Sequence, residues 1–377
     1  MILSIFTGIL LRGCCNTASV SMFHIGIYMR SSNSRLLFLD RLRAIAIIMV
    51  VCVHTFAYTA ELSEHTLSIL KFIVLTIAVP IFFMVDGFLL SQNQKKIASI
   101  TYMSYIKFSA TRLVVPWVAF TVAYTLLRYL SEQYNIVNNN LIIGESFTEV
   151  VVNSYAAVYS SQLYFLLSLF FIRLLSPLIL LIAGAKKIYV SAITFVFYLI
   201  LYSLIKTDIN YILHVEGGQE PLLHAFWGLQ FYLFGVVANR LYVEGGLENA
   251  LPLLSLLFMV LIIVFLKIES IFMNIVIQYS YLAWLFVLCF KLEAVLSAFQ
   301  MIGENTMGIY LLHVPIVLNG VALVVSGIMI SPEINFLLIA SITTLLSLVI
   351  TLVIRKVPYA HFLFGERERK STAECKL

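Results

Sequence analysis

Residues 43–54 read RAIAIIMVVCVH, which places ten uncharged residues between an arginine and a histidine. A helix needs about 20 mostly apolar residues to cross the hydrocarbon core of a bilayer. The apolar run continues on both sides of the quoted stretch. It therefore predicts a membrane-spanning helix over residues 38–60, with one ionisable side chain near each end of its apolar part.

The composition extends this prediction to the whole chain. Of the 377 residues, 61% are hydrophobic and 11% are charged, whereas about 25% of the residues of a soluble domain are charged. A water-soluble protein is excluded. We predict an all-α polytopic membrane protein with about ten transmembrane helices, near residues 38–60, 68–91, 113–130, 162–183, 188–205, 225–243, 250–267, 270–290, 307–330 and 334–355.

The distribution of lysine and arginine predicts the orientation. All of these residues except Lys71, Arg128, Arg173, Lys206 and Lys267 lie in alternate connections or at the same membrane edge. The positive-inside rule then places both termini in the cytoplasm. The net charge of +5 reflects this sidedness, so we expect no nucleic-acid partner. We divide the chain into an N-terminal tail (1–34), an integral membrane domain (35–358) and a basic cytoplasmic tail (359–377).

Arg43 and His54 are expected to share one face of their helix. Eleven positions at ~100° each amount to about 1,100°, within about 20° of three full turns, and separate the side chains by about 16 Å along the axis. Taken singly, Arg43 is also explained as an interfacial anchor, and His54 as a core histidine. Together they favour a site in which a cation near the cytoplasm holds a phosphate and an imidazole deeper in the membrane transfers a proton.

Other ionisable side chains fall inside or beside predicted spans, where such residues are costly and indicate function by default. Asp86 is either a helix-end carboxylate paired with Lys95 or Lys96, or a partner of Arg43 or Arg112. Arg112 is either a positive-inside anchor or part of the site. The remaining candidates are Arg173, which needs a partner that the sequence does not identify, Glu304 at a membrane edge, and Tyr310 and His313, which precede Pro315.

The order of motifs resembles the membrane-bound acyltransferase family 3. LDRLRAIAIIMVVCVH (39–54) resembles the opening signature of that family, in which an arginine, ten residues and a histidine follow one another. Five further segments match in order: VPIFFMVDGFLL (79–90), RLVVPW (112–117), QLYFLLSLFFIRLLSPLI (162–179), FWGLQFYLFGVVANR (226–240) and GENTMGIYLLHVPI (303–316). One such segment is a weak signal, whereas six in the same order are a strong one.

The resemblance implies a function. Such proteins move acyl groups, commonly acetyl, from cytoplasmic acyl-CoA to hydroxyls of bacterial envelope or exopolysaccharide sugars, as the O-acetyltransferases of enterobacterial common antigen do. It implies His54 as the catalytic residue and Arg43, Arg112 and Lys107 as donor-binding residues. We expect supporting roles for Asp86, Arg173, Glu304, Tyr310 and His313, a bacterial cytoplasmic-membrane location, contact with membrane lipids, and neither a bound cofactor nor a metal.

Three positions depart from the family pattern, and two other functions stay open. Asp86 replaces the usual serine, Tyr164 replaces the usual tryptophan, and Ser109 stands where a first arginine is expected, with Lys107 nearby. A transporter or flippase for lipid-linked sugars would also carry ionisable residues within its spans. An accessory protein of a polysaccharide synthase would not need Arg43 and His54 on one face. The sequence does not identify the acceptor sugar.

Overall fold

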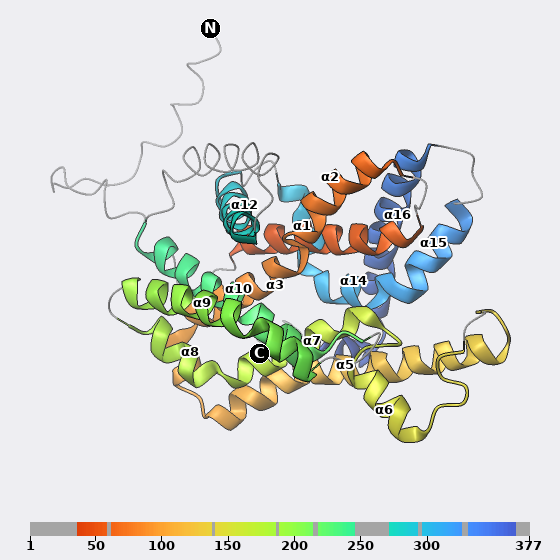
Figure 1. The fold of residues 1–377 in the computed structure, drawn as a ribbon, viewed down its shortest axis with the longest axis horizontal. Helices are drawn as coiled ribbons and strands as arrows, with labels where there is room; N and C mark the ends of the chain where they lie inside the picture. The colour runs from red at the N-terminus through yellow and green to blue at the C-terminus, as the bar shows by residue number, and fades with distance from the viewer. Residues whose placement is uncertain are drawn as a thin grey trace, which may run out of the picture. The chain divides into compact units, whose positions relative to one another are not determined.

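A computed structural model of the chain describes residues 36–58, 62–137, 140–185, 188–213, 218–245, 271–292, 296–325 and 331–366. Within these ranges the chain is helical and contains no strand (Figure 1). The principal helices are α1 (Leu37–Thr55), α2 (Glu64–Leu75), α3 (Ala78–Gln92), α4 (Gln94–Ala98), α5 (Tyr102–Gln133), α6 (Phe147–Tyr155), α7 (Tyr164–Leu174), α8 (Ser176–Ala183), α9 (Ile188–Leu213), α10 (Pro221–Val243), α12 (Ile271–Lys291), α13 (Gln300–Glu304), α14 (Thr306–Leu312), α15 (Leu318–Val325) and α16 (Pro332–Ile354).

Seven helical stretches of the described ranges are long and apolar enough to cross a membrane, or eight if the bent pair α7 and α8 forms one span. In this count α2 and α3 together form one stretch (Glu64–Gln92), and so do α14 and α15 (Thr306–Val325). Helix α1, which covers most of the span predicted at 38–60, is not among them, because its first two turns carry Asp40, Arg41 and Arg43. The predicted span at 250–267 and the N-terminal tail (1–34) lie outside the described residues, so the prediction of ten spans stays untested there.

Within the described ranges three predicted spans are interrupted, one of them at 307–330, where α14 ends and α15 begins. The span predicted at 68–91 consists of α2 and α3, which meet at Thr76 and Ile77. The span predicted at 162–183 bends by 64° between α7 and α8. Pro177 lies in the first turn of α8, where it is tolerated because the first amides of a helix have no partner within the helix.

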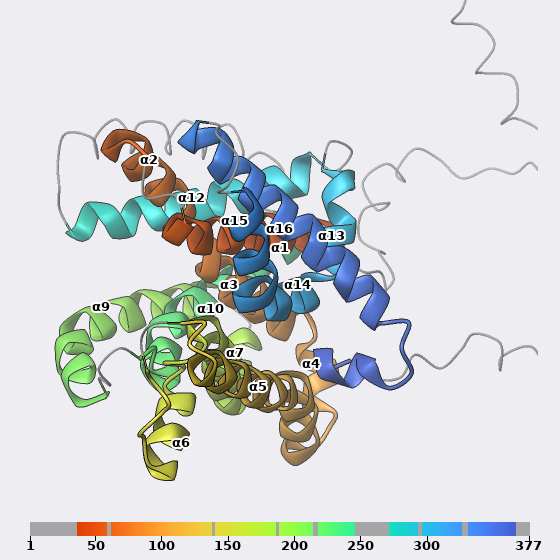
Figure 2. The same cartoon turned by 90° about the vertical axis from the view of Figure 1, so that its right-hand side faces the viewer.

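The helices form two groups that α3 connects. In Figures 1 and 2, α1, α12, α14, α15 and α16 gather on one side and α5, α7, α8, α9 and α10 on the other. Helix α3 packs against α10 in the second group and against α1 in the first. Helix α1 also contacts α12, α13, α14 and α16, so Arg43 and His54 lie on a helix with neighbours along its length.

Glycines let the backbones approach closely at these contacts. A Cβ atom on Gly87 of α3 would lie 2.0 Å from the carbonyl oxygen of Tyr232 in α10, and one on Gly235 of α10 would lie 2.0 Å from that of Met84. A Cβ on Gly303 would lie 1.8 Å from the carbonyl oxygen of Asp40 in α1. No side chain fits at these distances, which explains why the recognisable segments around Asp86, Trp227 and Glu304 contain glycine.

Gly87→Ala should destabilise the protein by about 3 kcal/mol, the upper part of the usual range for an overpacked core. The added methyl group would meet backbone, which cannot rotate away. Gly320→Ala is the matched control, because a Cβ on that helical glycine meets nothing within 4 Å and alanine favours helix over glycine. Thermal unfolding in detergent should show a lower midpoint for Gly87→Ala only; equal midpoints would contradict the close packing of α3 on α10.

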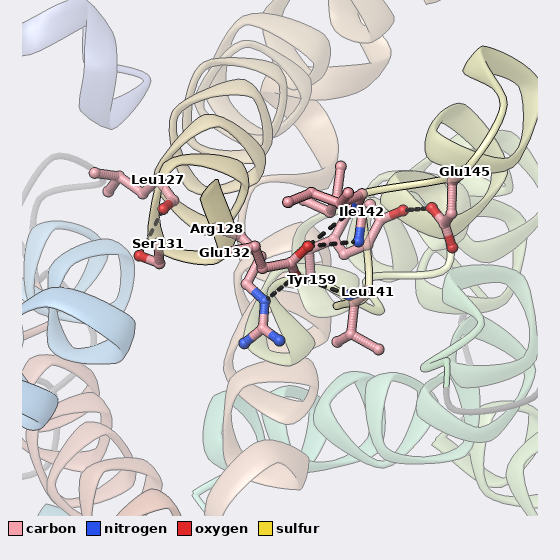
Figure 3. Close-up of polar contacts among 9 residues, drawn as sticks. Leu127, Arg128, Ser131, Glu132, Leu141, Ile142, Glu145 and Tyr159 are labelled. Carbon is pink, nitrogen blue, oxygen red and sulfur yellow. Dashed lines mark hydrogen bonds and ion pairs between the residues drawn. The ribbon is translucent and has the colours of Figure 1, made fainter. Parts of the chain in front are cut away.

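The segment between α5 and α7 forms a cap that is anchored by two carboxylates; we call residues 140–160 the cap. The Glu132 side chain is fully buried and accepts hydrogen bonds from the backbone amides of Leu141 (2.9 Å), Ile142 (2.9 Å) and Ile143 (3.1 Å). Arg128 Nε donates to the same carboxylate at 2.6 Å (Figure 3). A carboxylate with several such donors is well satisfied although it is buried.

The second anchor of the cap is Glu145. Its carboxylate accepts hydrogen bonds from the Tyr159 hydroxyl and, at 2.7 Å, from the Asn153 amide. Burial raises the pKa of Tyr159, so the phenol stays protonated and donates. A capping box of Ser146 and Glu149 begins α6 within the cap. The cap is therefore ordered by its own polar contacts.

Glu132→Ala should release the cap, because three backbone amides would lose their acceptor. We expect hydrogen exchange at residues 141–143 to accelerate at least ten-fold, which equals a loss of about 1.4 kcal/mol of protection and lies within the usual value of a hydrogen bond to a charged group. Glu333→Ala, an exposed first-turn substitution in α16, serves as the control. Unchanged exchange at 141–143 would contradict the anchoring role.

Candidate active site

Helix α1 carries the candidate site along one face. The helix is regular from Leu37 to Thr55, so the predicted same-face geometry of Arg43 and His54 holds. Ile47 and Val50 lie on that face between them and are buried, at 0% and 5% exposure. The face is therefore covered by packed neighbours, and its two polar residues mark two ends of the bundle, which we call the Arg43 end and the His54 end.

At the His54 end, two imidazoles face each other. The ring of His54 lies 5.1 Å from the ring of His313, centroid to centroid, at an interplanar angle of 60°. His54 is half-buried and His313 is fully buried. The side chains come from α1 and from the end of α14, which are in contact. The structure thus joins two histidines that are 259 positions apart in the sequence.

The hydrogen bonds of His313 fix its tautomer. His313 Nδ1 lies 2.7 Å from the carbonyl oxygen of Tyr310. A carbonyl only accepts, so Nδ1 carries the proton and Nε2 presents a lone pair. This buried Nε2 has no hydrogen-bond partner among the residues that the structure describes. An unsatisfied buried acceptor is costly, and a catalytic role is one of the explanations for such a group.

Pro315 breaks the helix next to this pair. Val314 has extended backbone angles (φ −124°, ψ 141°) between α14 and α15, as expected for the residue before a proline. The carbonyl that the break frees accepts a hydrogen bond from the Gln162 side-chain amide at 2.8 Å, and the Tyr310 hydroxyl donates to the Gln162 carbonyl. The break therefore leaves the Val314 carbonyl available for a hydrogen bond from another helix, in the residue next to His313.

At the Arg43 end, Asp86 and Arg173 form a bidentate ion pair. Arg173 Nε and Nη2 donate to the two carboxylate oxygens at 2.9 and 2.5 Å, and both side chains are more than 85% buried. Arg43 and Arg112 lie close enough to act on the charge of Asp86. The partner of Asp86 is therefore Arg173, and the alternatives of Lys95, Lys96, Arg43 or Arg112 as its direct partner are wrong.

The other charged candidates are placed less centrally. Arg43 contacts Asp40 at 3.2 Å, and the exposed Arg112 stacks over Phe108 at 5.6 Å. Lys107 is exposed on α5, and its position five residues before Arg112 turns it about 140° away around the helix. Glu304 is exposed on α13, where it accepts a hydrogen bond from Gln300 at 3.0 Å. None of these contacts involves His54.

Sequence reasoning missed His224 and Gln162. His224 precedes the span predicted at 225–243, but it lies in the first turn of α10, which begins at Pro221. The available signal was this proline, because proline is favoured at the first position of a helix. The His224 ring stacks on Tyr164 with centroids 4.1 Å apart. No local pattern distinguishes Gln162, whose role depends on the distant Val314.

A comparison with known families decides the assignment. The sequence profile of acyltransferase family 3, described as an acyltransferase domain, matches residues 36–356. The chain belongs to membrane-bound acyltransferase family 3. No curated protein and no solved structure matched the chain in the same comparison. The family makes the chain an acyltransferase, and its apolar helices make it a membrane protein. The paired histidines and the arginine cluster are the parts of this acyltransferase that can serve such chemistry.

Proposed function

We propose that this acyltransferase moves an acyl group, expected to be acetyl, from acyl-CoA at the Arg43 end to a hydroxyl of an envelope or exopolysaccharide sugar at the His54 end. The observation that carries the proposal is the His54–His313 pair, in which a half-buried imidazole lies 5.1 Å from a buried imidazole whose Nε2 has no partner among the described residues. The arginine cluster on the same helix face, about 16 Å away along α1, supports a donor site that is joined to it.

The Arg43 end has the charge that a phosphate-bearing donor needs. Arg43, Arg112 and Arg173 gather there against the carboxylates of Asp40 and Asp86. Arginine binds phosphate through a rigid fork of donors. Arg173 is buried in its pair with Asp86 and acts as a support, whereas Arg43 and Arg112 are more exposed, so we assign the phosphates of acyl-CoA to these two. Lys107, which is exposed on α5, adds positive charge for the same phosphates.

The His54 end has the groups for general base catalysis. His54 takes the proton of the sugar hydroxyl while that oxygen attacks the thioester carbonyl. The carbon–sulfur bond then breaks, and the leaving thiolate of CoA takes the proton back from His54. Once His54 is protonated, a small shift of its ring would let it donate a hydrogen bond to the free Nε2 of His313, and this contact would stabilise the imidazolium that forms between these steps.

The sidedness follows from charge. Lys95, Lys96, Arg112 and Lys356 lie at the Arg43 end or in connections that lead to it, and the positive-inside rule assigns that end to the cytoplasm. Acyl-CoA is then supplied from the cytoplasm of a bacterium, with the protein in its cytoplasmic membrane. The acceptor, a glycan or a lipid-linked sugar, reaches the other end.

Membranes containing the protein should transfer label from [¹⁴C]acetyl-CoA to the extracted envelope glycans. The expected product is an ester that mild alkali releases, and membranes without the protein give the baseline. Movement of lipid-linked sugar across vesicles without acetyl-CoA, combined with no labelled ester, would contradict the proposal and favour a flippase.

A further inference from the structure

A half-buried ring cluster lies at the His54 end beside the proposed catalytic pair. The Tyr164 and His224 rings are 4.1 Å apart at an interplanar angle of 44°, and the Trp227 ring lies 6.3 Å from His224 at 79°. All three side chains are partly exposed. The cluster is therefore an aromatic surface that a further ring can contact.

The polar atoms of the cluster point to a ligand with hydroxyl groups. His224 Nδ1 lies 2.9 Å from the carbonyl oxygen of Glu220, so Nδ1 carries the proton and Nε2 is left as an acceptor. Neither this Nε2 nor the Tyr164 hydroxyl has a hydrogen bond to another described residue. The surface thus combines aromatic faces with one acceptor and one group that both donates and accepts.

The cluster adjoins the catalytic pair through α7 and α14. Tyr164 follows Gln162 by two residues, and Gln162 is bonded to Tyr310 and Val314 on either side of His313. The next residue, Phe165, contacts the Tyr310 ring at 5.8 Å. His313 in turn contacts His54. Tyr164 begins α7 and Arg173 lies in its last turn, so a ligand on Tyr164 is separated from Arg173 by about 14 Å along that helix.

The surrounding structure holds this surface rigid. Ser168 donates a hydrogen bond to the Pro221 carbonyl at 2.7 Å and fixes α7 against the start of α10. The Gln219 amide donates to the Ala156 carbonyl at 2.6 Å and ties that start to the cap. The cap is anchored by Glu132 and Glu145 (Figure 3). Preorganisation of this kind lowers the cost of binding.

We propose that Tyr164 and His224 form the subsite that binds the sugar ring of the acceptor. The C–H face of a pyranose packs on an aromatic face such as that of Tyr164, and its hydroxyls reach the Tyr164 hydroxyl and His224 Nε2. The subsite holds the ring that bears the reacting hydroxyl, or the ring next to it, beside His54. This inference rests on the proposed acyl transfer and adds the residues that select the acceptor.

The test measures acceptor and donor kinetics separately. The full chain in nanodiscs receives [¹⁴C]acetyl-CoA and increasing amounts of the envelope glycan fraction that the wild type acetylates. Tyr164→Ala and His224→Ala should each raise the acceptor KM about ten-fold, leave the acetyl-CoA KM unchanged, and keep kcat within about three-fold of the wild type. Tyr164→Phe should recover most of the affinity because the ring remains.

His361→Ala is the matched control. The His361 ring also contacts an aromatic ring, that of Phe362, with centroids 4.4 Å apart. Because His361 follows α16 at the Arg43 end, the acceptor KM of His361→Ala should equal that of the wild type. Unchanged acceptor KM in both Tyr164→Ala and His224→Ala, with an active wild type, would overturn the subsite. A rise in the acetyl-CoA KM alone would overturn it as well. A wild type that acetylates no glycan would instead refute the proposed function.

Discussion

His54→Ala should lower kcat for acyl transfer by at least about a hundred-fold, since positioned general bases contribute about 10²–10⁴-fold. The imidazole is half-buried and lies 5.1 Å from the His313 ring, and alanine offers no proton acceptor there. Donor binding at Arg43 and Arg112 is separate from this position, so the acetyl-CoA KM should stay near that of the wild type. The measurement is initial-rate kinetics with [¹⁴C]acetyl-CoA and envelope glycan.

His65→Ala is the control for that experiment, because His65 is exposed on α2. His313→Ala should also slow the reaction, by a smaller factor, since His313 stabilises the charged form of His54 and does not itself take the hydroxyl proton. Full activity of His54→Ala, with the protein folded by circular dichroism, would show that the general base lies elsewhere.

Asp86→Asn should be the most destabilising of the conservative substitutions at the Arg43 end. It would leave the Arg173 guanidinium buried without its carboxylate, and breaking one partner of a buried pair costs about 3–5 kcal/mol. Both side chains are more than 85% buried, so solvent screens the charge weakly. Thermal unfolding in detergent should show a large decrease in the midpoint.

Two further variants test whether the pair itself is responsible. Asp86→Leu combined with Arg173→Met should be less destabilising than Asp86→Asn alone, because removal of both charges leaves none unpaired. Glu244→Gln breaks the ion pair of Arg240 and Glu244, in which the Glu244 side chain is 48% exposed, and should change stability by less than about 1 kcal/mol. An Asp86→Asn protein as stable as Glu244→Gln would contradict the buried pair.

Local sequence patterns predicted what depends on one helix. The eleven-residue separation of Arg43 and His54 predicted their shared face because α1 is regular from end to end. The continuous span expected at 307–330 is instead broken beside His313, since Pro315 and its preceding residue do not continue a helix. The apolar runs predicted most of the described spanning helices within a few residues, with α5 beginning 11 residues earlier than expected.

Contacts between segments that are distant in the chain could not be predicted from one sequence. Asp86 and Arg173 each stood out as a charge within a span, but several partners of opposite charge were available to Asp86, and helix packing decides among them. The facing of His54 and His313, and the bonds of Gln162 to Tyr310 and Val314, likewise depend on how α1, α7 and α14 pack. Glu132 was hidden because its partners are backbone amides, which every residue carries.

The central claim is that an acyl group passes from a donor at the Arg43 end to an acceptor at the His54 end of one bundle. Sealed inside-out membrane vesicles, loaded with envelope glycan and given [¹⁴C]acetyl-CoA only outside, test it most directly. We expect labelled glycan ester inside and free CoA outside, with the reaction of His54→Ala at least about a hundred-fold slower. Labelled ester that forms only when donor and glycan share one compartment, or at an equal rate in His54→Ala, would contradict it.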